Sequence, residues 1–276
     1  MLEGRPVADA IWRDVEQRAA AFEHRLGRTP RLGLVSGADS GAAAAYGRQI
    51  ERQFTRHGLD VAARTVPAAE LLEAVRGLSQ DDQIDGVVLL TPLPEEVDAD
   101  AAVQRIDPSK DVDGQHPASL GRLAQRRATF APATALGGVR LLDHYEIPVR
   151  GARVVVVGRS PVVGMPLSLL LIDADATVTV CHTRSVDLER LTREADILCV
   201  AAGRPGVIGP EHVKPGAIVL DFGTHPSADG AMLGDVQTEA VREIAGAITP
   251  VPGGTGPTTV AVLAQQTVRA AELRNR

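Results

Sequence analysis

Residues 153–171 read RVVVVGRSPVVGMPLSLLL, and this stretch decides the fold. The all-apolar run that ends at Val157 predicts a strand buried on both faces, as in a parallel sheet covered by helices. Gly158 and Gly164 delimit a short turn, and the apolar segment after Val163 predicts a helix. A buried strand, a glycine turn and a helix in this order indicate a unit of a doubly wound α/β sheet.

The rest of this half of the chain alternates in the same way. Further strands are predicted at 176–181, 196–202 and 217–223, and helices at 137–145 and 188–194. A loop is predicted near 125–135. We therefore interpret this half as a Rossmann-like nucleotide unit.

The N-terminal half also follows an α/β pattern. Helices are predicted at 7–26 and 46–54, and short buried strands at 31–36, 60–66 and 85–91. A Pro/Gly-rich turn at 248–257 precedes a last predicted helix at 258–276. A chain of 276 residues can form one large domain or two ordinary ones, and the pattern favours two.

Composition excludes several classes of partner. The formal net charge is −6 and no Lys/Arg run is long enough to follow a phosphate backbone, so we expect neither nucleic acid nor an anionic membrane as a partner. No apolar stretch is long enough to span a membrane, and the first residues lack a signal-peptide core, so we expect a cytoplasmic protein. Cys181 and Cys199 lie in apolar strands and are expected to be reduced core residues. We expect no metal site.

The glycine turn is a candidate nucleotide site. Glycine at positions 158 and 164 permits close backbone approach, and the unpaired N–H groups of the following helix attract a pyrophosphate. Arg159 and Ser160 lie between them. The stretch is not G-x-G-x-x-G, so a plain strand-to-helix turn is the alternative interpretation.

The end of the next strand favours NADP over NAD. Arg159 is suited to an adenosine 2′-phosphate, and the Thr183 hydroxyl follows the second strand. An acidic residue that would bind the ribose of NAD is expected there, but none occurs before Asp187. His182 alone is more often a structural or hydrogen-bonding residue than a catalyst.

The segment IDPSKDVDGQHPASLGRL, residues 106–123, carries two aspartates beside Lys110. Most such segments are charged surface turns. A carboxylate such as that of Asp113 can also accept two hydrogen bonds from a 2-amino-4-oxopyrimidine edge, as it does from a guanidinium group. A pterin presents that edge.

Several motifs, in order, resemble those of the methylenetetrahydrofolate dehydrogenase/cyclohydrolase family. They are TPLP at 91–94, KDVDG at 110–114, VVGRSPVVGMP at 156–166, TVTVCHTRS at 177–185 and ITPVPGGTGPTTVAVL at 248–263. The resemblance spans nearly the whole chain. It implies a folate-side domain of residues 1–128 completed by helix 258–276, an NAD(P)-binding domain of residues 129–257, and a homodimer. It also implies an active site in the cleft between the domains.

The resemblance assigns roles to individual residues. The active-site tyrosine falls on Tyr46 and the pterin-binding aspartate on Asp113. Further substrate contacts are implied for Pro252, Gly253 and Gly254. The residues implied to bind the cofactor are Gly158, Arg159, Ser160, Gly164, His182, Thr183, Thr134 and Gly256.

Two catalytic positions depart from the family pattern. The family's Y-x-x-x-K lysine falls on Ile50, and the glutamine of its V-Q-L-P-L-P segment falls on Leu90. Arg48 and Arg52 flank Ile50, but two residues on a helix turn a side chain by about 200° around the axis, so neither simply replaces the lysine.

These departures separate the two reactions of the family. Moving a hydride from methylenetetrahydrofolate to nicotinamide needs alignment and exclusion of water, and no side-chain base. Hydrolysis of the methenyl product needs water addition and a proton donor with a tunable pKa. Ile50 and Leu90 transfer no proton, so we expect NADP-dependent methylenetetrahydrofolate dehydrogenase activity with the cyclohydrolase step weak or lost.

Three alternatives remain open at this point. The chain is an ordinary bifunctional enzyme whose lysine is replaced by a residue elsewhere, or a specialised paralogue with a different one-carbon substrate, or a non-catalytic protein that binds folate or NADP. Nicotinamide turnover separates the third from the others, and substrate breadth separates the second.

Overall fold

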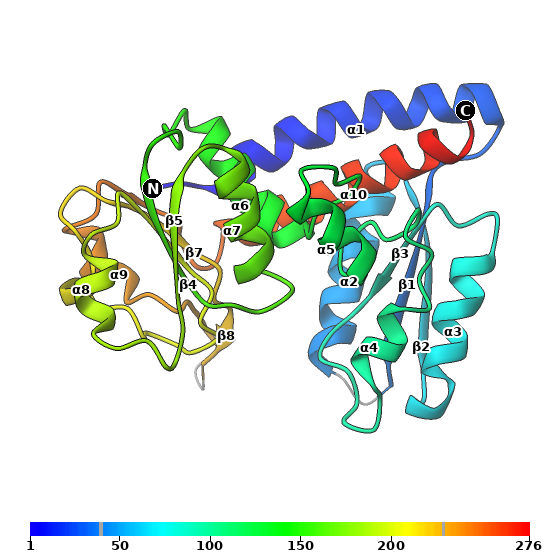
Figure 1. The fold of residues 1–276 in the computed structure, drawn as a ribbon. Helices are drawn as coiled ribbons and strands as arrows, with labels where there is room; N and C mark the ends of the chain where they lie inside the picture. Colours follow the sequence, from blue (N-terminus) through cyan, green and yellow to red (C-terminus); the bar gives the residue numbers. More distant parts are fainter. Residues whose placement is uncertain (39–40, 228–229) are drawn as a thin grey trace. The chain divides into compact units, whose positions relative to one another are not determined.

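The computed structural model describes residues 1–38, 41–227 and 230–276. The chain forms two compact α/β units, each made of more than one stretch of sequence (Figure 1). Unit 1 comprises residues 1–8 and 134–259, and unit 2 comprises residues 9–133 and 260–276. The predicted two-part α/β fold is confirmed.

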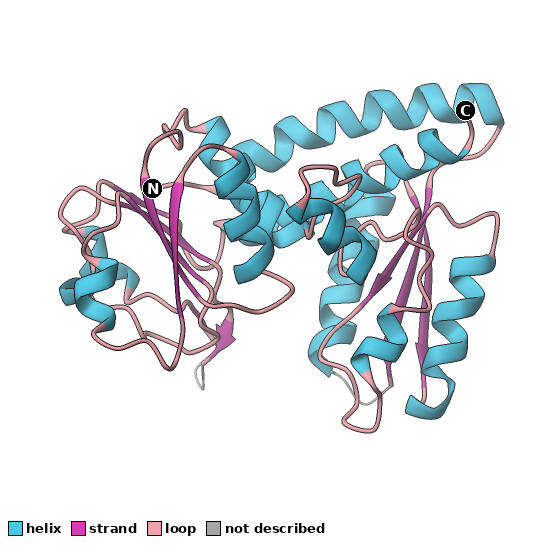
Figure 2. Cartoon of the chain, viewed as in Figure 1, coloured by secondary structure: helices cyan, strands magenta, loops and turns pink. Residues whose placement is uncertain are grey.

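Unit 1 contains a five-stranded parallel sheet in the order β10-β7-β6-β4-β5 (Figure 2). Its strands are β4 (Arg153–Val157), β5 (Thr177–Cys181), β6 (Ile197–Val200), β7 (Ile218–Asp221) and β10 (Ala247–Ile248). A small antiparallel pair is formed by β8 (His225–Pro226) and β9 (Met232–Leu233). The predicted strands at 176–181, 196–202 and 217–223 are confirmed, with ends that differ by one or two residues.

Helices lie on both faces of this sheet, with α6 and α7 on one side and α8 and α9 on the other (Figure 1). Their bounds are α6 (Ala133–His144), α7 (Gly164–Asp173), α8 (Leu188–Thr192) and α9 (Thr238–Arg242), and a short 3-10 helix, η1, covers Pro210–His212. The valines of β4 alternate between two apolar cores. Val154 and Val156 pack in one core, and Val155 and Val157 in the other. This explains why all four positions are apolar.

Residues 1–8, which the resemblance places with the folate side, pack with unit 1. The Leu2 N–H donates to the Ile248 carbonyl at 2.8 Å, and the Leu2 side chain is buried in the same core as Val154 and Val156.

Unit 2 contains a three-stranded parallel sheet in the order β2-β1-β3. Its elements are β1 (Arg31–Gly37), α2 (Gly41–Arg56), β2 (Asp60–Val66), α3 (Ala68–Gln80), β3 (Gly86–Leu89), α4 (Ala99–Val103) and α5 (Pro117–Ala124). Helices α2 and α3 cover opposite faces of the sheet (Figure 1). The predicted strand at 60–66 is confirmed, but the prediction that it is buried is wrong, because β2 lies at the edge of the sheet and all of its residues are exposed or half-buried.

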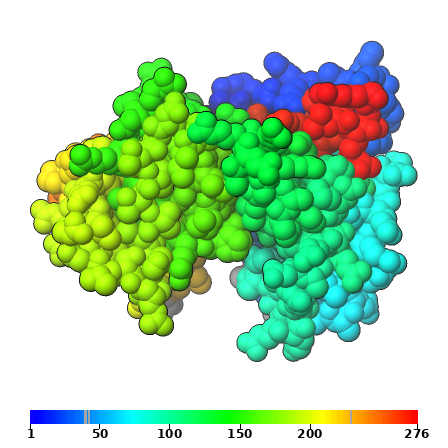
Figure 3. All heavy atoms as spheres, in the orientation of Figure 1, coloured from blue at the N-terminus to red at the C-terminus, as the bar shows by residue number. Residues whose placement is uncertain are grey.

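Two long helices have residues in both units. Helix α1 (Gly4–Leu26) enters unit 2 at Asp9, and α10 (Thr255–Arg274) enters it at Val260. Helix α3, which we did not predict, forms part of the cyan surface in Figure 3, and its buried side chains Leu71, Val75 and Leu78 face the sheet core.

The expectation that the two cysteines are core residues is met. Cys181 and Cys199 are free and fully buried, and burial raises the pKa of the Cys199 thiol to about 12, so neither is suited to nucleophilic attack. Among the described residues, no helix is long and apolar enough to cross a membrane.

Candidate active site

The nucleotide loop begins where β4 ends, in unit 1. Gly158 has φ +132°, and a Cβ at this position would lie 2.1 Å from the Ala201 carbonyl oxygen. A Cβ at Gly164 would lie 2.2 Å from the Gly158 carbonyl oxygen. The turn is therefore closed by direct backbone contacts that only glycine permits. Such a backbone cradle at a helix N-terminus fits the pyrophosphate of a dinucleotide.

Ser160 organises the rest of the loop. Its Oγ accepts hydrogen bonds from the N–H groups of Val163 at 3.1 Å and Gly164 at 3.4 Å. Two N–H groups that we expected to be free are thus already paired within the loop. Arg159 and Ser160 are both exposed. The guanidinium group of Arg159 is available for an anionic ligand.

The turn after β5 lies next to this loop, because Cys181 pairs with Val157 across the sheet. Nδ1 of His182 accepts the Arg184 N–H at 3.1 Å, and the Ser185 Oγ accepts the His182 N–H at 2.9 Å. His182 therefore shapes the turn. Thr183 at its tip is exposed. We did not single out Ser185, whose role comes from a local turn that has no periodic signal.

The closing loop follows β10 and precedes α10. The Gly4 N–H donates to the Gly253 carbonyl at 2.8 Å, and a Cβ on Gly4 would lie 1.8 Å from the Gly254 carbonyl oxygen. Gly253 has φ +107°, whereas a side chain at Gly256 would enter open space. Gly253 and Gly254 therefore determine the course of the loop, whereas the space next to Gly256 is open. Pro252 is exposed.

All the residues predicted to bind the cofactor belong to unit 1, together with the closing-loop residues. The turns that begin at Gly158, His182 and Thr249 each follow the carboxyl end of a parallel strand, so they share one edge of the sheet. Thr134 is half-buried in the first turn of α6.

Asp113 belongs to unit 2 and is half-buried. One carboxylate oxygen accepts from Gln115 Nε2 at 2.5 Å and the other from the Ala133 N–H at 3.2 Å. Burial raises the pKa of Asp113 to about 6, against these two hydrogen bonds, which favour the ionised form, while the charge of Asp111 adds to the rise.

The neighbouring Asp111 has a different environment. It is buried and accepts from the Gln115 N–H at 3.0 Å, the His116 N–H at 2.9 Å and the Ser119 Oγ at 2.6 Å. Its acceptor capacity is used by the turn itself. Asp113 is thus the aspartate of this pair that is better placed to bind a ligand.

Gln266 of α10 fixes the segment that carries Asp113. Its Nε2 donates to the carbonyls of Val112 at 2.6 Å and Ala131 at 2.9 Å, and its Oε1 accepts the Ala131 N–H at 3.0 Å. The side chain is buried. We did not predict this role, because the partners are more than 130 positions apart in the sequence.

Tyr46 is on α2 and lies close to Asp113. Burial raises the pKa of the Tyr46 phenol well above its ordinary value, and the negative charge of Asp113 adds to the effect. The structure thus brings together these two predicted site residues, and Tyr46 is a neutral phenol at physiological pH.

Ile50 and Leu90 are apolar and buried. Ile50 is one helical turn after Tyr46 and has no exposed surface, and Leu90 is 3% exposed. A Cβ on Gly47 would lie 2.8 Å from Leu90 Cδ1, so Leu90 occupies the space that glycine leaves on α2. Neither side chain holds or transfers a proton.

The sequence contains only two lysines, Lys110 and Lys214. Lys110 is buried and its Nζ donates to the Asp81 carbonyl at 2.7 Å, where α3 ends. Lys214 Nζ binds Asp196 at 2.6 Å in unit 1. Both ammonium groups are therefore engaged with groups other than Tyr46 and Asp113.

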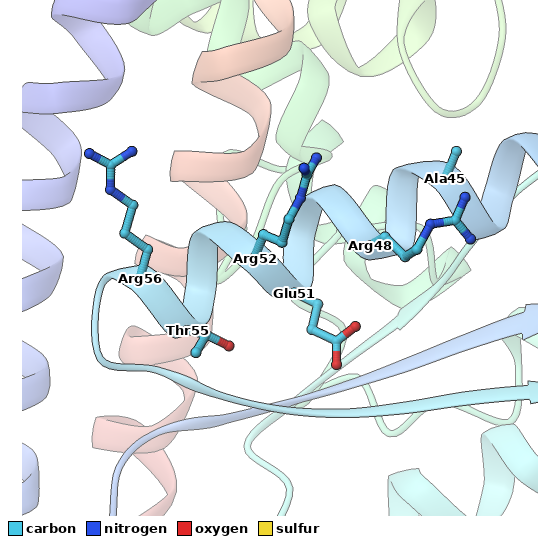
Figure 4. A pocket seen from close by; sticks show the side chains of 6 residues that line it. All are labelled: Ala45, Arg48, Glu51, Arg52, Thr55 and Arg56. Carbon is cyan, nitrogen blue, oxygen red and sulfur yellow. The ribbon is translucent and has the colours of Figure 1, made fainter.

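The arginines beside Ile50 face a surface hollow of about 750 Å³ on α2 (Figure 4). Arg52 and Arg56 point to one side of the helix, Glu51 points to the other, and Arg48 extends along the helix. All four are exposed, whereas Ile50 is fully buried. Arg48 and Arg52 therefore do not occupy the position of Ile50.

Within the described ranges, no group of three metal-ligating side chains occurs.

Comparisons with known proteins identify the family of this chain. Residues 2–113 match the family model for the tetrahydrofolate dehydrogenase/cyclohydrolase catalytic domain, and residues 132–275 match the model for its NAD(P)-binding domain. A bifunctional protein FolD from Chloroflexus aggregans is 46% identical, over 99% of this chain and 98% of the relative.

Two solved structures are similar over nearly the whole chain. The bifunctional FolD of Campylobacter jejuni has a TM-score of 0.95 and 34% identity, covering 99% of this chain and 98% of that one. The FolD of Trypanosoma brucei, complexed with NADP cofactor and inhibitor, has a TM-score of 0.94 and 34% identity, covering 99% and 97%.

Proposed function

Because this chain belongs to the tetrahydrofolate dehydrogenase/cyclohydrolase family, we propose that it oxidises 5,10-methylenetetrahydrofolate to the 5,10-methenyl form with NADP⁺, and that its cyclohydrolase step is weak or lost. The observation that carries the second part is the fully buried Ile50, one turn from Tyr46, in a chain whose two lysines are engaged elsewhere.

Unit 1 supplies the cofactor half of this proposal. The backbone cradle at Gly158 and Gly164 fits the pyrophosphate, and the exposed Arg159 and Thr183 suit a 2′-phosphate. NADP⁺, when bound, accepts the hydride. The Trypanosoma brucei relative in complex with NADP supports this choice over NAD.

Unit 2 supplies the folate half. Ionised Asp113 accepts two hydrogen bonds from the pterin edge, and Tyr46 lies against the same site. Gln115 and the Ala133 N–H hold the carboxylate, and Gln266 holds the backbone on either side of it. These groups position the substrate and exclude water, which is what hydride transfer requires.

Hydrolysis of the methenyl product makes a further demand. A water molecule must be held and a proton delivered, and a buried lysine is well suited to both tasks. Ile50 and Leu90 are buried and apolar, so they supply neither. The arginines at 48 and 52 are exposed and poor proton donors at neutral pH.

A bifunctional enzyme is the second candidate. Relatives that are 43–46% identical are named bifunctional FolD. The specific observation in its favour is Asp113, whose pKa of about 6 is close to the value that suits a general acid or base. In that case Asp113 carries the proton in place of the lysine.

The first test mixes the protein with methylenetetrahydrofolate and either NADP⁺ or NAD⁺ and follows reduced nicotinamide and methenyltetrahydrofolate at separate wavelengths. We expect both products to rise together and methenyltetrahydrofolate to persist. Its conversion to 10-formyltetrahydrofolate well above the spontaneous rate would favour the bifunctional enzyme. If neither product appears with either cofactor, the dehydrogenase proposal is refuted. A different one-carbon substrate or a binding role would then remain.

The second test restores a lysine. We expect Ile50→Lys to gain cyclohydrolase activity and to keep dehydrogenase activity, because the ammonium group would enter the site beside Tyr46. Ile50→Met is the matched control, since it has a similar length and no titratable group. Equal cyclohydrolase rates in the two variants would contradict the proposed role of this position.

Light scattering on the same preparations tests the homodimer that the resemblance implies.

A further inference from the structure

Two buried aspartates lie at the carboxyl edge of the unit 1 sheet, and the proposed reaction does not use them. Asp221 is the last residue of β7, and Asp235 follows β9. Neither side chain has exposed surface. Buried carboxylates are retained only with full hydrogen bonding, so their partners indicate what they hold in place.

Asp235 binds three consecutive backbone N–H groups of the segment that follows β6. One carboxylate oxygen accepts from Ala202 at 2.6 Å and Gly203 at 3.0 Å, and the other accepts from Arg204 at 2.9 Å. His225 Nε2 lies 2.7 Å from the second oxygen. The course of residues 202–204 is thus fixed by one side chain.

This segment is in contact with the nucleotide loop. The Ala201 N–H donates to the Val157 carbonyl at 2.7 Å, immediately before Gly158. The Ala201 carbonyl oxygen occupies the space that a Cβ on Gly158 would need. A shift of residues 202–204, which Asp235 holds, would therefore move Ala201. Its contact with Gly158, where the nucleotide loop turns, would then change.

Asp221 in turn binds the backbone at Asp235. Its carboxylate accepts the N–H groups of Asp235 at 3.0 Å and Val236 at 2.9 Å. The backbone of Asp221 is bound in turn by the hydroxyls of Thr249 and Thr255, at 2.8 and 3.3 Å, on either side of the closing loop. The two aspartates therefore connect the closing loop, the segment 202–204 and the nucleotide loop.

We propose that Asp235 is a positioning residue for NADP: it holds residues 202–204 against Gly158 and so sets the shape of the dinucleotide site. The inference rests on the proposed function only for the identity of the cofactor. It predicts a defect in cofactor binding that leaves the folate side unchanged.

The variant that tests this is Asp235→Asn. An amide has one acceptor oxygen, and its NH₂ group would face N–H donors, so the segment 202–204 would lose part of its anchor. We expect the Kd for NADPH, measured by fluorescence, to rise at least tenfold. The KM for NADP⁺ should rise by a similar factor, with kcat and the KM for methylenetetrahydrofolate within twofold of the parent protein.

Asp85→Asn is the matched control. Asp85 is also fully buried and accepts two hydrogen bonds from Arg28, at 2.7 and 2.9 Å, and one from the Arg31 N–H at 2.9 Å. It belongs to unit 2, so its loss should lower stability and leave NADPH affinity unchanged. Equal weakening of NADPH binding in both variants would overturn the proposal, as would an unchanged Kd in Asp235→Asn.

His225→Leu tests the same idea with a smaller change, in case Asp235→Asn does not fold. It removes one partner of the carboxylate and leaves the three backbone bonds. We expect faster amide hydrogen exchange at residues 202–204 and a roughly threefold rise in the NADPH Kd. If neither changes, the proposal is refuted. A parent protein that binds NADPH but oxidises no methylenetetrahydrofolate would refute the proposed reaction alone.

Discussion

In unit 1 the nucleotide loop turns at direct contacts between backbone atoms, whereas in unit 2 the chemistry of the candidate site depends on the side chain of Asp113. Because Gly158 has no Cβ, the Ala201 carbonyl can approach it closely. The Gly158 carbonyl approaches Gly164 for the same reason. On the folate side, the Gln115 side chain binds the Asp113 carboxylate, and the Gln266 side chain binds the backbone of the preceding Val112.

The difference indicates how each site can change. A backbone site depends on main-chain geometry, so most of its side chains can vary while it still recognises a phosphate. A site made of side chains changes its chemistry with one substitution, because proton transfer depends on the identity of one group. The folate side is therefore where we expect one reaction of the family to be lost while the other is kept.

The largest effect is expected for Gly158→Ala. The added methyl group would lie about 2.1 Å from the Ala201 carbonyl oxygen, in a backbone conformation that disfavours alanine. We expect NADPH binding, followed by fluorescence, to weaken by more than about 100-fold (about 2.7 kcal/mol or more). Gly121→Ala is the control, because its Cβ would enter open space. If Gly158→Ala bound NADPH as tightly as the parent protein, the nucleotide loop would not depend on this backbone contact.

Asp113→Asn is expected to have the next largest effect, on the other ligand. The amide keeps one acceptor oxygen and loses one of the two charge-assisted bonds to the pterin edge, which is worth roughly 1.5–3 kcal/mol, so the KM for methylenetetrahydrofolate should rise by about 10- to 100-fold. The Kd for NADPH should stay within twofold. A parallel loss of NADPH affinity would show that the two sites are not independent.

Folate binding should also depend on pH through Asp113. Because its pKa is raised to about 6, the carboxyl is protonated below that value and accepts the pterin bonds poorly. We expect the Kd of a stable folate, measured by calorimetry without cofactor, to rise up to roughly tenfold per pH unit below pH 6. Asp113→Asn should bind weakly with no such dependence.

The same carboxyl affects stability with the opposite sign. The folded pKa is above the unfolded value of 3.8, so the group contributes stability at low pH and this contribution is lost as the pH rises through about 6. We therefore expect Asp113→Asn to be slightly more stable than the parent protein at pH 8, measured by denaturant unfolding, and to lose this advantage at pH 4.

The smallest effect on ligand binding is expected for Gly47→Ala, which concerns packing. Its methyl group would lie about 2.8 Å from Leu90 Cδ1, and relieving this overlap should cost about 1–3 kcal/mol of unfolding free energy. In a Leu90→Ala background, the Gly47→Ala substitution should cost much less, because the overlapping methyl group is absent. If the single substitution stabilises the protein as alanine usually stabilises a helix, the contact between α2 and Leu90 is not as described.

The sequence predicted best what depends on continuous apolar runs. Strands β4 and β6 are apolar on both faces and have no other good interpretation. Helix α3 escaped prediction because it follows Pro67 without a side-chain cap, and two of its buried positions are the small residues Ala74 and Ser79. Helix α2 begins at Gly41, five residues before its predicted start, because the preceding alanines contribute little to an apolar stripe.

The candidate sites divide along the same line. Gly158 and Asp113 belong to compact motifs and could be named from the sequence. Asp235, Gln266 and Ser185 could not, because their partners are either distant in the sequence or backbone groups of irregular turns. Such roles depend on where the folded chain places N–H and C=O groups, which local patterns do not encode.

The discontinuous units also bear on the order of synthesis. Unit 2 requires residues 260–276, and the segment that carries Asp113 is held there by Gln266. A growing chain on the ribosome will have completed every strand of both sheets before that glutamine is made. The nucleotide unit can therefore mature first, and the proposed pterin site can form only when the helix that carries Gln266 has been translated.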